Sequence, residues 1–145
     1  PRIMASILKV DDLRGNTATG NITITSEGGS ATMQLQQGVA KAWATFNASG
    51  TPAFRDSFNS STLTDNGTGN MTISFTNNFG AAYNYTAGGQ VAHSGSTTTS
   101  YCCQPFSQPT ILTGSCQYSI LYNTASAAGA ADYVYCATTN HGDLA

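Results

Sequence analysis

One stretch, Gly38–Phe79, decides the predicted fold, and it has the sequence GVAKAWATFNASGTPAFRDSFNSSTLTDNGTGNMTISFTNNF. Within it, Asn70–Phe75 alternates apolar and polar side chains, which predicts a strand with one buried face. The preceding Asp65–Gly69 is rich in turn-forming residues, and its Asn-Gly pair tolerates the positive φ angles of a tight hairpin. Ser61–Thr64 is therefore the expected partner strand.

Short strand-like runs recur about every ten residues along the rest of the chain, with turn-forming residues between them. In the run Ala81–Thr86, the rings of Tyr83 and Tyr85 are expected on one face. This spacing predicts an all-β fold, an antiparallel β-sandwich or jelly roll. The other predicted strands are Ser6–Asp11, Asn21–Thr25, Ala42–Phe46 (which holds the only tryptophan, Trp43), Cys116–Tyr122 and Asp132–Ala137.

The only predicted helix covers Ala31–Val39. Ser30 would cap its N-terminus and Gly38 would end it. Two helical turns are marginally stable alone, so packing must hold them, either around a threefold axis or across the mouth of a sandwich. Residues 1–30 are too short and too interrupted to fold alone. We therefore predict an N-terminal anchoring arm over residues 1–30 and a β-sandwich domain with a short leading helix over residues 31–145.

The composition is unusually poor in charge. Charged residues make up 8% of the 145 residues, whereas about a quarter is typical. Residues 66–131 contain no Asp, Glu, Lys or Arg. Hydroxyl and amide side chains take their place, as on the surface of an extracellular or virion protein, or on faces buried between subunits. The net charge of −2 and the lack of a basic cluster argue against nucleic-acid binding. No apolar run approaches the roughly 20 residues of a membrane span.

Residue types for catalysis or metal binding are few. The two histidines, His93 and His141, are not in a metal-binding spacing, and no G-x-S-x-G elbow is present. Asp56, Asp65 and Asp132 could supply the carboxylate pair of a glycosidase. The turn accounts for Asp65, and Arg55 beside Asp56 favours an ion pair or a subunit contact. We therefore expect neither an enzyme nor a cofactor or metal site.

The stretch Gly38–Phe79 resembles part of a known protein family. Three motifs, Lys41-Ala42-Trp43, Arg55-Asp56-Ser57-Phe58-Asn59 and Asp65-Asn66-Gly67-Thr68-Gly69, resemble a module of tailed-bacteriophage virion proteins, and so does the opening from Met4. The likeness covers roughly the first half of the chain. It leaves open whether Met4 is the natural start, with Pro1-Arg2-Ile3 added, or whether the chain is a processed fragment.

The resemblance implies a structural protein of the virion that is assembled in the host cytoplasm. We expect a homotrimer whose arm contacts capsid, portal, neck or tail proteins. A fibre or fibre-like appendage of the tail, neck or head is the first expectation, and a head decoration (cement) protein is the alternative. The candidate subunit contacts are Leu35, Val39, Trp43, Arg55 and Asp56.

A third reading is a module that recognises host glycans. Sugars stack on exposed aromatic rings, and the chain holds seven tyrosines and six phenylalanines. The opposing interpretation is that these rings fill the core between two sheets. The candidate glycan contacts are Tyr83, Tyr85, Tyr101 and Tyr118.

Four cysteines, Cys102, Cys103, Cys116 and Cys136, allow up to two disulfides. Cys102 and Cys103 are adjacent, so on a strand they point to opposite faces and would need different partners. The C-x₂₋₄-C spacing of zinc sites is absent. Assembly in a reducing cytosol favours free, buried thiols, with disulfides as the alternative.

Overall fold

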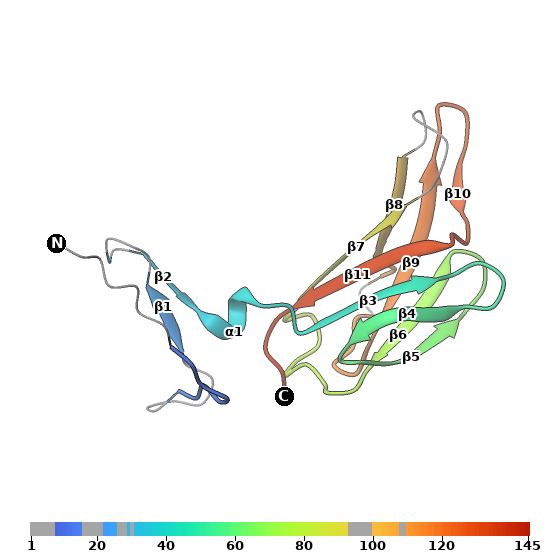
Figure 1. The fold of residues 1–145 in the computed structure, drawn as a ribbon. Coiled ribbons are helices and arrows are strands. Elements are labelled where there is room, and N and C mark those ends of the chain that lie inside the picture. Colours follow the sequence, from blue (N-terminus) through green and yellow to red (C-terminus); the bar gives the residue numbers. More distant parts are fainter. Residues whose placement is uncertain (1–7, 16–21, 26–28, 30, 93–99, 108–109) are drawn as a thin grey trace. The chain divides into compact units, whose positions relative to one another are not determined.

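The computed structural model describes residues 8–15, 22–25, 29, 31–92, 100–107 and 110–145 (Figure 1). The chain divides into two compact units, Pro1–Gly38 and Val39–Ala145. The predicted helix cap at Ser30, the residues before Met4 and most of the loop that contains His93 lie outside the described residues.

The first unit holds a two-stranded antiparallel ribbon, in which β1 (Thr23–Thr25) pairs with β2 (Thr32–Gln34). The helix α1 covers only Leu35–Gly38, so the prediction of a helix over Ala31–Val39 was wrong for its first half. Thr32–Gln34 gain ladder hydrogen bonds from β1 that a two-turn helix could not match. The predicted strand Ser6–Asp11 is also absent over its described part, residues 8–11.

The second unit is one antiparallel sheet that curls into a nearly closed, barrel-like sandwich, which confirms the predicted all-β class. The strand order is β4-β3-β11-β7-β8-β9-β6-β5, and β10 pairs with β9 (Figure 1). The strands are β3 (Ala42–Asn47), β4 (Ala53–Phe58), β5 (Ser60–Asp65), β6 (Asn70–Phe75), β7 (Thr86–Ala92), β8 (Ser100–Pro105), β9 (Ser115–Asn123), β10 (Ala128–Ala130) and β11 (Tyr135–His141).

The predicted hairpin is confirmed, because β5 pairs antiparallel with β6. Its loop differs from a two-residue turn. Positive φ angles occur at Gly67 and Gly69, and not at Asn66. The backbone N–H of Asn66 donates to the carbonyl of Asn70 at 2.9 Å, and the N–H of Gly67 donates to Oδ1 of Asp65 at 2.8 Å. The two glycines therefore supply the left-handed conformations that the Asn-Gly pair was expected to share.

The strand β4 was not predicted, and it contains a bulge at Arg55. Phe54 lies opposite Phe46 on β3, whereas the next pair is Asp56 opposite Thr45. The extra residue reverses the alternation, so Phe54 packs against the core and Phe58 is exposed outside.

The core lies between the inner faces of the strands. Small residues on β3 let it approach the opposite wall, and large side chains from β6 and β9 fill the space. The fully buried side chains include Ala42, Phe46, Met71, Ile73, Phe79, Tyr118 and Ile120.

Two predicted strands were placed wrongly. Residues 81–85 form turns, with a positive φ at Tyr83, and the strand begins at Thr86 and runs through Gly88 and Gly89. The strand expected at Asp132–Ala137 begins only at Tyr135 and extends to His141. Asp132 is committed to the Gly69 loop, because its Oδ1 accepts a hydrogen bond from the Gly69 N–H at 2.7 Å.

Candidate functional site

A polar cluster occupies the interior of the barrel. The hydroxyl of Tyr118 donates to Oδ1 of Asn140 at 2.7 Å, and both residues are buried. The hydroxyl of Thr138 is buried and makes no hydrogen bond to a described residue. The Tyr118–Asn140 hydrogen bond stabilises the interior, whereas the unsatisfied Thr138 hydroxyl costs free energy. Because these groups are buried, they do not form a substrate site.

The four cysteines are free thiols, and three of them are buried. Burial raises the pKa of the Cys103 thiol and that of Cys116, and it raises the pKa of Cys136 to about 11. Cys102 is half-buried and Cys103 is buried, as expected for neighbours on opposite faces of β8. Neutral, buried thiols act as small apolar groups and lack the thiolate needed for nucleophilic chemistry.

The four tyrosines considered for glycan binding are not brought together. Tyr85 is buried, stacks on Phe79 with centroids 4.1 Å apart, and donates its hydroxyl to the Leu112 carbonyl at 2.9 Å. Tyr118 is buried in the polar cluster, so neither ring can meet a sugar. Tyr83 is exposed in a turn, whereas Tyr101 is half-buried on β8.

The residues considered for subunit contacts retain exposed surface. Val39 is exposed in the second unit, and Leu35 of the first unit is half-buried. Trp43 is half-buried, and Arg55 and Asp56 are exposed. The expected Arg55–Asp56 ion pair does not form.

The hydrogen bonds of β4 explain why that ion pair is absent. The guanidinium of Arg55 instead donates to the Val134 carbonyl at 3.0 Å. The carboxylate of Asp56 accepts from the N–H of Ser57 at 2.8 Å. Arg55 therefore ties the bulge in β4 to the segment that precedes β11.

The candidate carboxylates of a hydrolase are likewise used in backbone hydrogen bonds. Asp65 and Asp132 bind the N–H groups of Gly67 and Gly69, in the same loop. Within the described part of the chain, no group of three His, Cys, Asp or Glu side chains could hold a metal ion. These carboxylates organise the β5–β6 loop.

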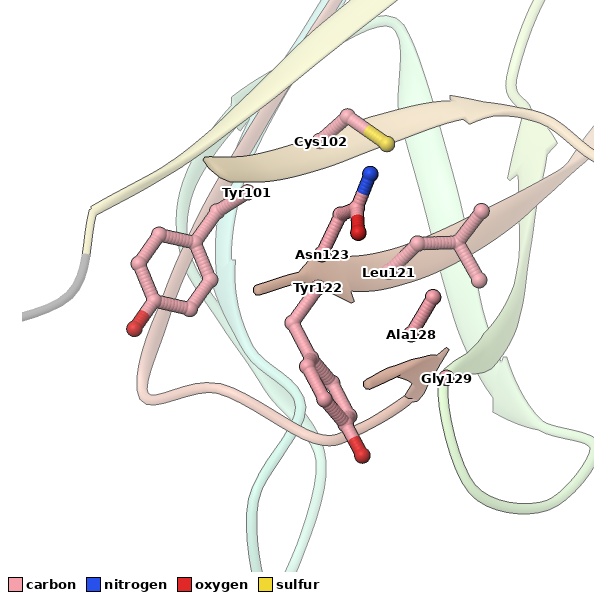
Figure 2. Close-up of a pocket in the computed structure, with 7 residues that line it drawn as sticks. All are labelled: Tyr101, Cys102, Leu121, Tyr122, Asn123, Ala128 and Gly129. Atoms are coloured by element: carbon pink, nitrogen blue, oxygen red, sulfur yellow. The ribbon is translucent and has the colours of Figure 1, made fainter. Parts of the chain in front are cut away.

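An open hollow of about 560 Å³ lies on the ribbon formed by β8, β9 and β10 (Figure 2). The side chains of Cys102, Leu121, Asn123 and Ala128 lie on one side of the strands, and the rings of Tyr101 and Tyr122 point to the other. This arrangement follows from the register, in which Tyr101 pairs with Tyr122 and Cys102 pairs with Leu121. The lining is mainly apolar, and its polar side-chain groups are the amide of Asn123, the thiol of Cys102 and the phenols of Tyr101 and Tyr122, so the hollow can accept a contact but contains no acid–base pair.

A second, shallower hollow of about 270 Å³ lies on the outer face of β7 and β11. Gly88, Gly89 and Gln90 line it from β7, and Ala137 and Thr139 line it from β11. Sequence reasoning missed it because the predicted strand Ala81–Thr86 stopped before Gly88 and Gly89, whereas β7 runs through both.

Comparisons with known proteins found no match to a family model, to a curated protein or to a solved structure. Among the described residues, no helix has the length and apolar character needed to cross a membrane.

Proposed function

We propose that the chain is a structural protein of a tailed-bacteriophage virion, a homotrimeric fibre or fibre-like appendage that the first unit anchors to the particle. The resemblance of the Lys41–Trp43, Arg55–Asn59 and Asp65–Gly69 motifs supports this assignment. The low charge of the chain, 8%, also suits surfaces that are buried between subunits.

The observation that carries the proposal is the lack of a core in the first unit. None of its described residues with an assigned exposure is buried. A two-stranded ribbon with exposed apolar side chains is marginally stable in water, so a partner must cover it. The exposed apolar side chains are Leu8, Val10, Leu13, Ile24 and Met33.

Analytical ultracentrifugation of the full chain tests the assembly. We expect a species of three times the chain mass of 15.0 kDa. Met33→Asp, in the first unit, should dissociate it, because a charge buried at a subunit contact is unfavourable. The matched control Val134→Asp changes an exposed apolar residue of the second unit and should leave the assembly intact. A parent chain that stays monomeric at micromolar concentration would contradict the trimer.

Imaging of purified particles that carry the chain tests its place in the virion. A fibre is expected in small multiples at one vertex or along the tail. Hundreds of copies over the icosahedral lattice would instead identify a cement protein, and absence from the particle would overturn the virion assignment.

A further inference from the structure

The outer face of four neighbouring strands presents two rows of side chains, of which only Trp43 and Asp56 were considered above, as subunit contacts. The register places Phe58 on β4 opposite Trp43 on β3, Trp43 opposite Thr139 on β11, and Thr139 opposite Gly88 on β7. These strands lie side by side in Figure 1. With a spacing of about 4.8 Å between strands, the row spans about 14 Å.

A second row runs beside the first and is mainly polar. It consists of Asp56, Thr45, Ala137 and Gln90 on the same four strands. We call the eight residues of the two rows the Trp43 face. Their neighbours in sequence, including Ala44, Phe46 and Thr138, point into the core, which shows that the two rows face outward.

The bulge at Arg55 and the glycines of β7 shape the two ends of the Trp43 face. The bulge puts Phe58 outside, where it is 53% exposed and pairs in register with Trp43 on the next strand. At the other end, Gly88 leaves the hollow of about 270 Å³ above β7 and β11. A Cβ atom added at Gly88 would meet nothing within 4 Å, so the space above this residue is open.

The first row of the Trp43 face is aromatic on β4 and β3, whereas the second row carries the carboxylate of Asp56, the hydroxyl of Thr45 and the amide of Gln90. Thr139, Thr45 and Gln90 offer neutral donors and acceptors. A pyranose ring matches this combination, because its C–H face packs on aromatic rings and its hydroxyl rim needs directional hydrogen bonds. The rows contain no Lys or Arg, so the face does not suit phosphate or acidic sugars.

We propose that the Trp43 face binds neutral oligosaccharides, with one sugar ring stacked on Trp43 and Phe58 and a second ring in the hollow at Gly88, two to three strands away. A hollow of this size is near the lower end of ligand pockets, which suits one ring and not a macromolecule. The proposal does not depend on assembly into a virion, and it concerns residues other than the four tyrosines considered at first.

The single tryptophan makes the test direct, because fluorescence excited at wavelengths that the seven tyrosines do not absorb reports on Trp43 alone. The full chain is titrated with the methyl glycosides of glucose, galactose, mannose and N-acetylglucosamine, and with oligosaccharides of these sugars. Sialyllactose serves as an acidic comparator. We expect a saturable change in emission with at least one neutral saccharide and none with sialyllactose.

Two variants and a control locate the binding. Gly88→Gln places a side chain in the hollow, where its Cβ would meet nothing within 4 Å, and Phe58→Ser removes one of the two aromatic rings. Each should weaken binding by about tenfold or more. The control Phe106→Ser removes a phenylalanine that is 52% exposed, outside the face, and should bind as the parent does. Thermal unfolding confirms that each variant is folded.

The proposal is overturned if no neutral saccharide gives a saturable change, if sialyllactose alone does so, or if either folded variant retains the affinity of the parent. None of these results bears on the trimer, which is measured by sedimentation.

Discussion

The hydroxyl of Tyr118 on β9 donates a 2.7 Å hydrogen bond to Oδ1 of Asn140 on β11. These strands are not neighbours, since β7 and β8 lie between them in the sheet. The bond therefore crosses the interior of the barrel and joins two of its walls. It links β11, near the C-terminal end of the chain, to the wall that carries the β5–β6 hairpin.

Removing this hydroxyl should destabilise the domain. Tyr118→Phe leaves the buried oxygen of Asn140 without its donor, which we expect to lower the free energy of unfolding by about 1–3 kcal/mol. Urea unfolding, followed by circular dichroism, measures the loss. Tyr122→Phe is the matched control on the same strand, where the residue is only half-buried, and it should change little. Equal losses in both variants would contradict this role.

Two glycines with similar φ angles should respond differently to alanine. Gly69 has φ +66° and Gly50 has φ +72°. A Cβ at Gly69 would lie 2.6 Å from the Ile120 carbonyl oxygen, whereas at Gly50 it would meet nothing within 4 Å. Gly50→Ala should lower the free energy of unfolding by about 1–2 kcal/mol, the cost of holding alanine in a left-handed conformation. Gly69→Ala should lower it clearly more, because the clash adds to this cost. Comparable shifts in their urea midpoints would argue against the clash.

Asn59 connects β4 to β5 and should be sensitive to substitution. Its φ is +53°, and its side-chain amide donates to the carbonyls of Lys41 and Asn77 at 2.9 and 3.1 Å. Asn59→Gly keeps the backbone conformation but loses these bonds, so we expect a loss of about 1–3 kcal/mol. Asn59→Ala should lose more, because it adds the conformational cost. If alanine proves no worse than glycine in urea unfolding, the backbone at this position is not strained.

The buried thiols predict a decline in stability at alkaline pH. Burial raises the pKa of Cys136 from 9.0 to about 11, and it also raises the pKa of Cys103 and Cys116. The buried, neutral thiols therefore make their full contribution to the free energy of unfolding below about pH 9. The contribution of Cys136 is lost as the pH rises from 9 to 11. Thermal unfolding from pH 7 to pH 11 should show a falling midpoint above pH 9. A flat profile would contradict it.

Alkylation of the native protein tests the same burial by another route. Iodoacetamide at pH 8 should modify Cys102 first, because Cys103, Cys116 and Cys136 are buried. Peptide mass spectrometry after short exposure identifies the modified residue. Modification of all four at the same rate, without added denaturant, would contradict the closed interior.

Local patterns in the sequence predicted the elements that local chemistry determines. The β5–β6 hairpin and most of β9 follow from clean alternation and a glycine-rich turn. The strand β4 escaped prediction because a bulge breaks its alternation at Arg55. The alternation in Ala81–Thr86 predicted a strand, but contacts outside that run hold Tyr85 in place. Its ring stacks on Phe79, and its hydroxyl donates to the carbonyl of Leu112, which is distant in sequence.

The Trp43 face was predicted only in part. Trp43 stood out as the only tryptophan, yet its neighbours on the face come from three other strands, whose register the sequence does not reveal. Gly88 and Gly89 lay beyond the predicted strand Ala81–Thr86, whereas both belong to β7. Gly89 has no side chain because a Cβ would lie 2.6 Å from the Ala137 oxygen and 2.8 Å from the Cys103 oxygen.

The two edge strands of the sheet, β4 and β5, are consecutive in the chain, and no ladder joins them among the described residues. Over the residues that the structure describes, each other pair of neighbouring strands in the barrel is joined by backbone hydrogen bonds, and only β4 and β5 are not. Here the side chain of Asn59 holds the two edges together through its hydrogen bonds to Lys41 and Asn77. Local opening of the barrel should therefore begin between β4 and β5. The amide protons of β4 should exchange with deuterium before those of β9, because β9 is paired with a strand on both sides.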